Sequence, residues 1–518
     1  MKTRNLFLSL FAFAALCACN KEAQQDTPVG LENDAYVTVS IVAPSSISTR
    51  GNSGTTDEFY DEGESAENTV SNATFIFFKA DGTYDQIATP SLSFKDNVTG
   101  PNPFIEKVSE ATVILKAPVD PGMAAKYMLV VLNAPAGFAA AVEDKSLTLA
   151  EVKVLADDYS EGFVMTNSVY ANTGVEASDI SGNIKNSAAE ALANPVTVYV
   201  ERILAKVTVT DTGWKLKDDT DAVVTELNLP LDAVADTDGN GLYDNGVTKT
   251  VVPVIVGYGL TNTAKTSYLY KNVSGWNIDE SWVFDDKNKR SYWATSHATE
   301  YYTHAYSDFV QVTVKSDGTT EGDLKKSFYC MENTTSEKLN KTSLIVDVQF
   351  VDATTKKPIE TFYKCETDYY TEDGLKAVAV QMLKGAGLTS YTTTDIEIVA
   401  NAKQSSVKVK TTDDNVTAAS ALSTMANVKK WDGGKAYYYT NIEHFGTDKA
   451  TPANNLVGVV RNHVYQLTIQ SIKGFGAPIG GGTEEVVPDT PEDEEYQNLA
   501  ATIKILQWKV VNQNVNLQ

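Results

Sequence analysis

The sequence predicts an all-β protein with few short helices, organised as two β-sandwich domains. Strand-like segments rich in β-branched and aromatic residues dominate the chain, and Gly, Pro, Asn or Asp bound them. The length of 518 residues suits two large β-rich domains. Apolar residues make up 42% of the chain and charged residues 21%, a composition typical of globular proteins.

The chain opens with a secretory signal peptide over residues 1–19. Lys2 and Arg4 precede an apolar run, residues 6–15, that is too short to span a bilayer comfortably. The run ends in Leu16-Cys17-Ala18-Cys19, which resembles the lipobox of bacterial lipoproteins, with a small residue directly before Cys19. We expect lipidation at Cys19, whose acyl chains would fix the precursor to a membrane. The alternative is a plain signal peptide that ends in two cysteines.

Residues 20–50 are predicted to contain one strand. Its apolar residues alternate and share one face: Ala35, Val37, Val39, Ile41 and Ala43. The polar stretch after this strand contains Arg50, the only arginine between Arg4 and Arg202. An exposed, extended loop with one rare basic residue suits proteolysis between Arg50 and Gly51. The alternative is an ordinary solvated loop residue.

We expect β-sandwiches over residues 51–210 and 211–475. Strand candidates include residues 73–84, 125–135, 196–210, 251–260, 342–352 and 461–472. Within residues 196–210, the apolar residues first occupy the face of Val196, Val198 and Val200. They then continue on the other face, from Ile203 onward in steps of two. A strand permits such a shift only with a bulge or a change of sheet. We therefore expect the domain boundary near residue 210.

Two helices are predicted. Thr148 and Glu151 have capping-box spacing at the start of the first helix. The second, over residues 374–385, has an apolar stripe that we interpret as core packing. The stripe consists of Leu375, Val378, Ala379, Met382 and Leu383.

Cys330 and Cys365 remain after removal of the leader. Export permits a disulfide, but the two residues lie on the first and third of three successive predicted strands. In a simple meander they would be roughly 9.5 Å apart, beyond the roughly 7 Å that a disulfide tolerates. We expect two free, partly buried thiols.

The C-terminus has a tether followed by a strand. Residues 476–498 are acidic and rich in Gly and Pro, so they extend and bury no core. Residues 499–518 favour β-structure, and a terminal strand on a tether is free to pair with another chain. The alternating apolar residues of this segment change from one face of the strand to the other twice, which predicts bends or bulges. The successive sets are Ala501, Ile503 and Ile505, then Leu506, Trp508 and Val510, then Val511, Val515 and Leu517.

Charge and motifs exclude several functions. The net charge of −24 disfavours nucleic acid and anionic membrane surfaces as partners. The sequence has no nucleophile-elbow, Walker or zinc-protease motif, so we expect neither an enzyme nor a cofactor. One segment fits part of a calcium loop, through Asp236, Asp238, Asn240, Gly241 and Asp244. The twelfth position is Val247 in place of the expected glutamate, so an ordinary turn is the alternative.

The order of these features resembles a family. The lipobox, the short strand before Arg50, "FIFFKADG", "MLVVLNAP", "FVMTNSVY", "VERILAKV", "FYCMEN", "GVVRNHVYQLTIQSIKGFG", the acidic linker and the Trp-containing last strand are similar to the Bacteroidia fimbrillins, the subunits of type V pili. The resemblance covers essentially the whole chain and is strongest to shaft subunits.

The resemblance implies two transthyretin-like sandwiches and export as a lipoprotein. It also implies that residues 20–50 are a propeptide, released by an arginine-specific protease that cuts between Arg50 and Gly51, and that subunits assemble head-to-tail by strand exchange. The strand that contains Val37, Val39 and Ile41 would be removed, and residues 499–517 of a neighbour would replace it. Expected partners are further copies of the chain, accessory tip and anchor subunits, and host or bacterial surface receptors.

Two other functions compete with this one. A permanently lipid-anchored surface protein that binds a glycan or a protein would remain monomeric and keep its acyl chains on Cys19. A secreted hydrolase is the third class, and no motif in the sequence supports it.

Overall fold

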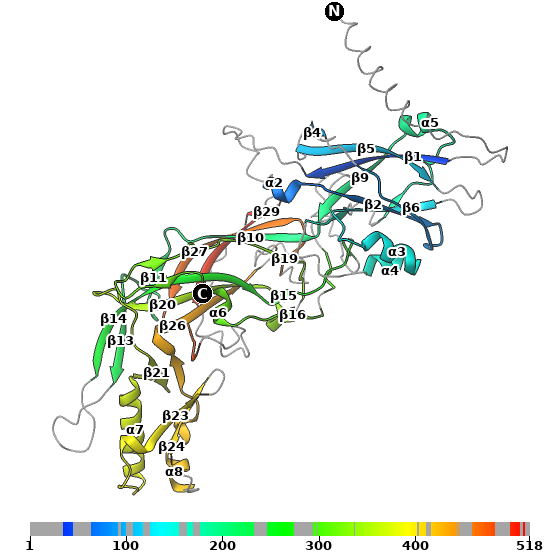
Figure 1. Ribbon diagram of the computed structural model, residues 1–518. Coiled ribbons are helices and arrows are strands. Elements are labelled where there is room, and N and C mark those ends of the chain that lie inside the picture. Colours follow the sequence, from blue (N-terminus) through cyan, green and yellow to red (C-terminus); the bar gives the residue numbers. More distant parts are fainter. Residues whose placement is uncertain are drawn as a thin grey trace, which may run out of the picture.

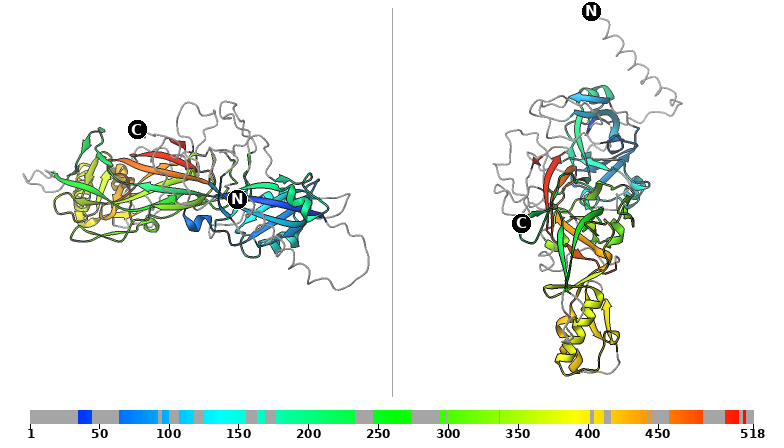
Figure 2. Two further views of the ribbon diagram at one scale, coloured as in Figure 1. Left: turned by 90° about the horizontal axis from the view of Figure 1, so that it is seen from above. Right: turned by 90° about the vertical axis from the view of Figure 1, so that its left-hand side faces the viewer.

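The computed structural model describes residues 35–44, 64–91, 95–99, 107–117, 125–154, 163–168, 177–232, 246–273, 294–297, 299–335, 337–400, 404–410, 416–442, 444, 458–481, 498–507 and 511–512. These residues form mostly strands with a few short helices, which confirms the predicted all-β class. Two sandwiches and a small third unit lie one after another along an elongated molecule (Figures 1 and 2). None of the helices in the described ranges has the length and apolar character needed to span a lipid bilayer.

The first sandwich is one continuous sheet folded over its own core. Its strands, in spatial order, are β3 (Tyr84–Ala88), β2 (Ala73–Lys79), β6 (Ala125–Leu132), β7 (Met165–Asn167), β9 (Val196–Arg202), β1 (Ala35–Pro44), β5 (Lys107–Ala117) and β4 (Lys95–Thr99), with β8 (Ser178–Asp179) on β6. Strand β9 joins the two layers, because Val196 to Tyr199 pair with β1 and Val200 to Arg202 pair with β7. The core between the layers includes Phe75, Phe77, Met128 and Val130.

Helices accompany this sandwich. They are α2 (Ser65–Asn68), α3 (Phe138–Lys145), α4 (Leu149–Val154) and α5 (Ala188–Ala193). The predicted capping box at the start of α4 is confirmed: the amide of Thr148 donates to Glu151 Oε2 at 2.7 Å, and the amide of Glu151 donates to Thr148 Oγ1 at 3.3 Å.

The second sandwich packs two sheets face to face. One contains β12 (Val223–Val224), β11 (Lys215–Lys217), β27 (His463–Lys473), β10 (Leu204–Thr210) and β19 (Ser327–Met331), together with β29 (Asn498–Gln507) and β30 (Val511–Asn512). The other contains β25 (Lys429–Trp431), β21 (Phe362–Cys365), β22 (Asp368–Tyr370), β13 (Leu227–Asp232), β14 (Val247–Thr261), β20 (Ser343–Asp352), β26 (Lys435–Asn441) and β28 (Ala477–Pro478). The shared core includes Val207, Leu467, Leu344 and Phe350.

Short elements complete the second sandwich. They are the pair β15 (Thr263–Ala264) and β16 (Tyr301–Tyr302), the pair β17 (Thr313–Val314) and β18 (Thr320–Glu321), helix α6 (Tyr306–Phe309), and the single 3₁₀ turns Lys338–Asn340 and Asp432–Gly434. Helix α6 packs closely on β14. A Cβ atom at Gly259 would lie 1.8 Å from the ring of Phe309, so this position requires glycine.

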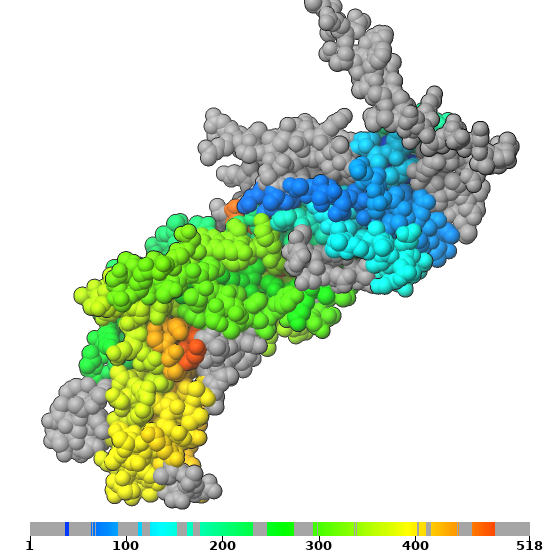
Figure 3. Space-filling view, viewed as in Figure 1, coloured from blue at the N-terminus to red at the C-terminus, as the bar shows by residue number. Residues whose placement is uncertain are grey.

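A small third unit is inserted between β22 and β25, and the sequence analysis did not predict it. It contains α7 (Glu372–Gly385), α8 (Val416–Ala421), the hairpin β23 (Ile396–Ala400) and β24 (Ser405–Val409), and the 3₁₀ turns Thr393–Asp395 and Ser423–Ala426. The predicted stripe on α7 is confirmed as core packing, since Leu375, Ala379 and Leu383 are buried. This unit forms the end of the molecule farthest from the first sandwich (Figure 3).

The chain passes from the first sandwich to the second at Ile203. Strand β9 ends at Arg202 in the first sheet, and β10 begins at Leu204 in the second. Apolar side chains from both sandwiches pack together here, among them Phe138, Ile203, Leu269 and Met331. The two sandwiches therefore share a buried interface, and no flexible linker separates them.

The meander predicted around the two cysteines is wrong. Cys330 lies in β19, which pairs with β10, whereas β20 and β21 belong to the opposite sheet with three strands between them. Local alternation marked these strands correctly, but their pairing depends on segments far away in the sequence. Both cysteines are free and buried, as expected, and burial raises the pKa of the Cys330 thiol to about 12.

Candidate strand-exchange site

Strand β1, predicted to be removed on maturation, is an internal strand of the first sandwich. It pairs antiparallel with β5 along its whole length, from Ala35 opposite Ala117 to Pro44 opposite Val108. On its other edge, Val39 to Val42 pair in parallel with β9. Removal of β1 would leave the facing edges of β5 and β9 without a partner along this stretch.

The described side chains of β1, from Val37 to Ser40, are buried on both faces of the strand. Val37 and Val39 are fully buried in the core with Phe75 and Met128. On the opposite face Thr38 is fully buried, and helix α5 contacts the strand. The side chain of Ile41, the third predicted core residue of this strand, lies outside the described residues.

The terminal strand β29 lies along β27 of its own chain. The two pair antiparallel from His463 opposite Gln507 to Lys473 opposite Asn498, with a bulge between Ile469 and Ser471. Strands β10 and β11 occupy the other edge of β27, and β30 folds back onto β29. The terminal strand therefore covers a sheet edge that would otherwise be open (Figure 1).

Strands β1 and β29 have matching lengths and patterns. Each has ten residues. The sequence Val37-Thr38-Val39-Ser40-Ile41-Val42 can be aligned with Ala501-Thr502-Ile503-Lys504-Ile505-Leu506, so that apolar residues coincide at alternate positions and a threonine follows the first. Because side chains alternate along a strand, both sequences suit a groove with one apolar wall.

Two of the five arginines are fully buried at the junction of the sandwiches. Arg202 Nε donates to the carbonyl oxygen of Glu67 at 2.8 Å. Arg461 forms an ion pair with Glu332, with Nε 3.3 Å from Oε2. Its Nη2 also donates to the carbonyl oxygen of Tyr268 at 2.7 Å, in the segment that packs against the first sandwich. Neither arginine is accessible to a protease in the folded chain.

Glu67 of α2 connects the first described residues after β1 to the junction. Lys206 Nζ lies 2.6 Å from Glu67 Oε1, and the hydroxyl of Tyr329 donates to the same oxygen. Burial alone would raise the pKa of Glu67, but these hydrogen bonds outweigh it, and the pKa is lowered. Glu67 is thus ionised at neutral pH and holds α2 against β10 and β19.

Several predicted residues lie outside the described part of the chain. These are Cys19, Arg50, Gly51, Asp236, Asp238, Asn240, Asp244, Trp508 and Val510. Among the residues that the structure describes, no group of three or more His, Cys, Asp or Glu side chains could hold a metal ion.

The sequence of the second sandwich matches a known family. Residues 429–514 match the model described as "Major fimbrial subunit protein type IV, Fimbrillin, C-terminal". The match confirms the fimbrillin resemblance over β25 to β30, including both β27 and the terminal strand β29.

Comparison with solved structures gives distant similarities. A candidate cell adhesion protein from Parabacteroides distasonis is 12% identical, with 93% of this chain and 100% of that chain covered and a TM-score of 0.41. A fimbrillin from Porphyromonas gingivalis is 13% identical, with coverages of 92% and 99% and a TM-score of 0.34. A tip fimbrial protein from the same organism, truncated at its C-terminus, is 10% identical, with coverages of 92% and 100% and a TM-score of 0.32. No curated protein matches the chain.

Proposed function

We propose that this protein is the precursor of a fimbrial shaft subunit that polymerises by donor-strand exchange. It is exported as a lipoprotein, cleaved between Arg50 and Gly51, and assembled head-to-tail at the cell surface with tip and anchor subunits. Contacts with host or bacterial receptors follow from this location. The observation that supports the proposal most directly is the burial of β1, a strand N-terminal to Arg50, in a chain with a fimbrillin C-terminal region.

Loss of β1 would leave the first sandwich incomplete. Full burial of a valine stabilises a fold by about 1.5 to 3 kcal/mol, so Val37 and Val39 together contribute about 3 to 6 kcal/mol. Cleavage after Arg50 would also leave the edges of β5 and β9 open to another strand. A neighbour's terminal strand would restore both the core contacts and the strand pairing.

The pairing of β29 with β27 suits a precursor that must not polymerise early. In this state β1 fills the acceptor groove, and the terminal strand covers an edge of its own chain. After cleavage, β29 would leave β27 and enter the groove of the next subunit. Because donor and acceptor are different surfaces, the contact is head-to-tail and produces an open filament.

The N-terminus of surface material tests the processing steps. A fimbrial subunit purified from cells should begin at Gly51. A chain that begins at lipidated Cys19 would contradict the proposal and favour the lipid-anchored binding protein.

Substitution in the terminal strand tests exchange separately. Ile503→Asp should abolish polymers of the cleaved protein while the monomer stays folded, because a charge in an apolar groove is costly. Asn516→Asp, at a polar position near the C-terminus, is the matched control and should polymerise normally. Filaments of unchanged length and yield from the Ile503→Asp protein would rule out this donor strand.

A further inference from the structure

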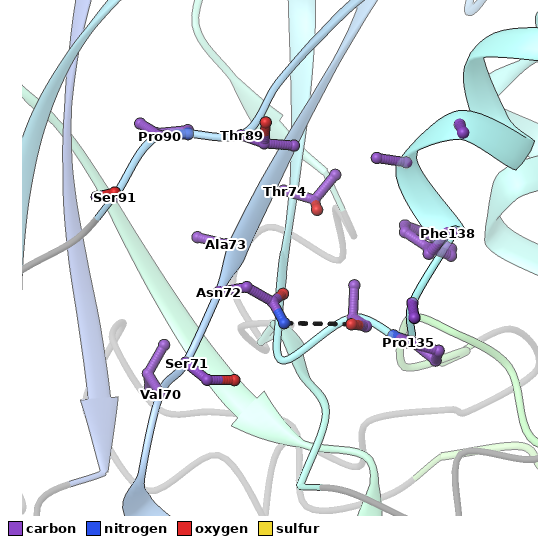
Figure 4. Close-up of a pocket in the computed structure, with 15 residues that line it drawn as sticks. Val70, Ser71, Asn72, Ala73, Thr74, Thr89, Pro90, Ser91, Pro135 and Phe138 are labelled. Atoms are coloured by element: carbon purple, nitrogen blue, oxygen red, sulfur yellow. Dashed lines mark hydrogen bonds between the residues drawn. The ribbon is translucent and has the colours of Figure 1, made fainter.

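A pocket of about 530 Å³ opens in the first sandwich beside the start of β2. The start of β2, residues 89–91 after β3, the loop before α3 and the first turn of α3 form its walls (Figure 4). Its volume lies in the range of about 300 to 1,000 Å³ that is typical of small-molecule sites.

The first turn of α3 supplies two unpaired backbone donors to this pocket. The amide of Phe138 donates to the carbonyl oxygen of Pro135 at 3.1 Å, and the amide of Ala141 donates to that of Gly137 at 2.9 Å. The amides of Ala139 and Ala140, which line the pocket, form no hydrogen bond within the described residues. Helix α3 also lacks a side-chain cap. Free amides and the helix dipole both favour an anionic oxygen at this point.

Thr74 is a second, independent feature of the pocket. Ala73 and Phe75 face the sandwich core, so the alternation of β2 turns Thr74 toward α3. Its side chain is only 3% exposed and lines the pocket, and it forms none of the hydrogen bonds found among the described residues (Figure 4). Its hydroxyl oxygen is not among the fully buried unpaired groups, so it remains accessible to a polar ligand that enters the pocket.

The other described residues of the lining are uncharged and mainly small. Hydroxyl groups of Ser71, Thr89 and Ser91 surround walls of alanine and proline, and none of the described lining residues is Asp, Glu, Lys or Arg. An anion would therefore meet no acidic group among the described residues of the pocket, despite the net charge of −24. Exposed acidic groups farther than about 8 Å are largely screened at physiological ionic strength.

We propose that this pocket binds a carboxylated sugar, such as a uronic acid residue of a glycan. The carboxylate accepts hydrogen bonds from the Ala139 and Ala140 amides, and a ring hydroxyl pairs with Thr74. The serine and threonine hydroxyls contact the rest of the ring edge, and Pro90 and Pro135 pack against its C–H face. This site is separate from strand exchange, so its test does not depend on polymerisation.

Ligand-observed NMR on the purified full chain tests the proposal. In a saturation-transfer experiment, glucuronate should receive magnetisation from the protein. The affinity for glucose should be at least about tenfold weaker because glucose lacks the carboxylate, and the affinity for acetate should be at least about tenfold weaker because acetate lacks the ring. Absence of transfer to glucuronate at about 10 mM, or equal binding of glucose, would overturn the site. Equal binding of acetate would overturn the assignment to a sugar.

Matched variants locate the binding. Ala140→Asp places a negative charge at the exposed first turn of α3, where it interacts favourably with the helix dipole but repels a carboxylate ligand. This substitution should weaken glucuronate binding at least about tenfold. Ala140→Asn has a similar shape without the charge and should retain binding. Thr74→Val should weaken binding several-fold, whereas Thr74→Ser keeps the hydroxyl and should not. Equal affinity of the Asp and Asn variants for glucuronate would contradict the proposal.

Discussion

Two buried arginines stabilise the junction between the two sandwiches. Arg202 and Arg461 are fully buried and hold the two sandwiches together through Glu67, Asn462 and Glu332. In the local sequence, the region around Arg202 stands out only through the shift of the apolar alternation between Val200 and Ile203. Glu67, the buried partner of Arg202, lies 135 residues away in sequence, and no local pattern links the two.

Protection of these arginines is testable by proteolysis. An arginine-specific protease should not cut the folded full-length chain after Arg202 or Arg461, because neither side chain can reach a protease pocket. It should cut after Arg50. Mass spectrometry of the fragments, before and after unfolding in urea, measures this. Cleavage at Arg202 in the folded protein would disagree with the junction described above.

Asp347 is a buried acid in the core strand β20. Neither carboxylate oxygen has a hydrogen-bond partner among the described residues, and burial raises the pKa of Asp347 well above its usual value. The folded state therefore favours the protonated form. The stability contributed by this group is fully present below about pH 4 and is lost as the pH rises through the folded-state pKa.

Replacement of this acid should stabilise the protein. Asp347→Asn should raise the free energy of unfolding by about 1 to 3 kcal/mol at neutral pH, and the gain should shrink as the pH falls toward 4. Urea unfolding at several pH values measures the difference. Asp323→Asn, at an exposed position, serves as the control. A gain that is independent of pH would show that the carboxylate is not the cause.

At the scale of elements, local sequence predicted strands well and their partners poorly. The alternation of Val37 and Val39 marked β1, and the capping box of Thr148 and Glu151 marked α4. Helix α7 was predicted, but the hairpin of β23 and β24 and the separate unit that it forms with α7 and α8 were missed. The strands of this hairpin differ from sandwich strands only in the segments they pack against. The pairing of β29 with β27 likewise depends on a contact across the acidic tether.

The role of β1 predicts a state-dependent effect of mutation. Val39→Ala should lower the free energy of unfolding of the uncleaved precursor by about 2 kcal/mol, because it removes buried methyl groups from the core. The same substitution should have no effect after cleavage at Arg50, when the strand has left. Thermal unfolding of both forms measures this, with Val223→Ala at a residue that is 60% exposed as the control. An equal loss in both forms would mean that β1 stays in place.

At the scale of the whole molecule, the shared interface makes the two sandwiches one structural unit. The apolar cluster around Leu269 and Ile203 and the buried pairs of Arg461 with Glu332 and Lys271 with Glu201 cross the junction or support it. In a filament, a subunit of this kind would transmit force without a flexible hinge. The proposed acceptor groove lies in the first sandwich and the proposed donor strand follows the second, so strand exchange would join subunits end to end.

A cysteine pair across the proposed intermolecular contact tests strand exchange most directly. Val113 is the partner of Val39 in β5, and the alignment of the two strands places Ile503 of a neighbour at this position. A register shift of two residues would place Ile505 there instead. Facing residues on adjacent strands lie about 4.5 to 5.5 Å apart, close enough for a disulfide. Polymers of the cleaved protein with Val113→Cys and either Ile503→Cys or Ile505→Cys should give a ladder of covalent oligomers on non-reducing gels. If both cysteine pairs gave only monomers on these gels although the filaments assembled normally, the exchange of β1 for a neighbour's terminal strand would be contradicted.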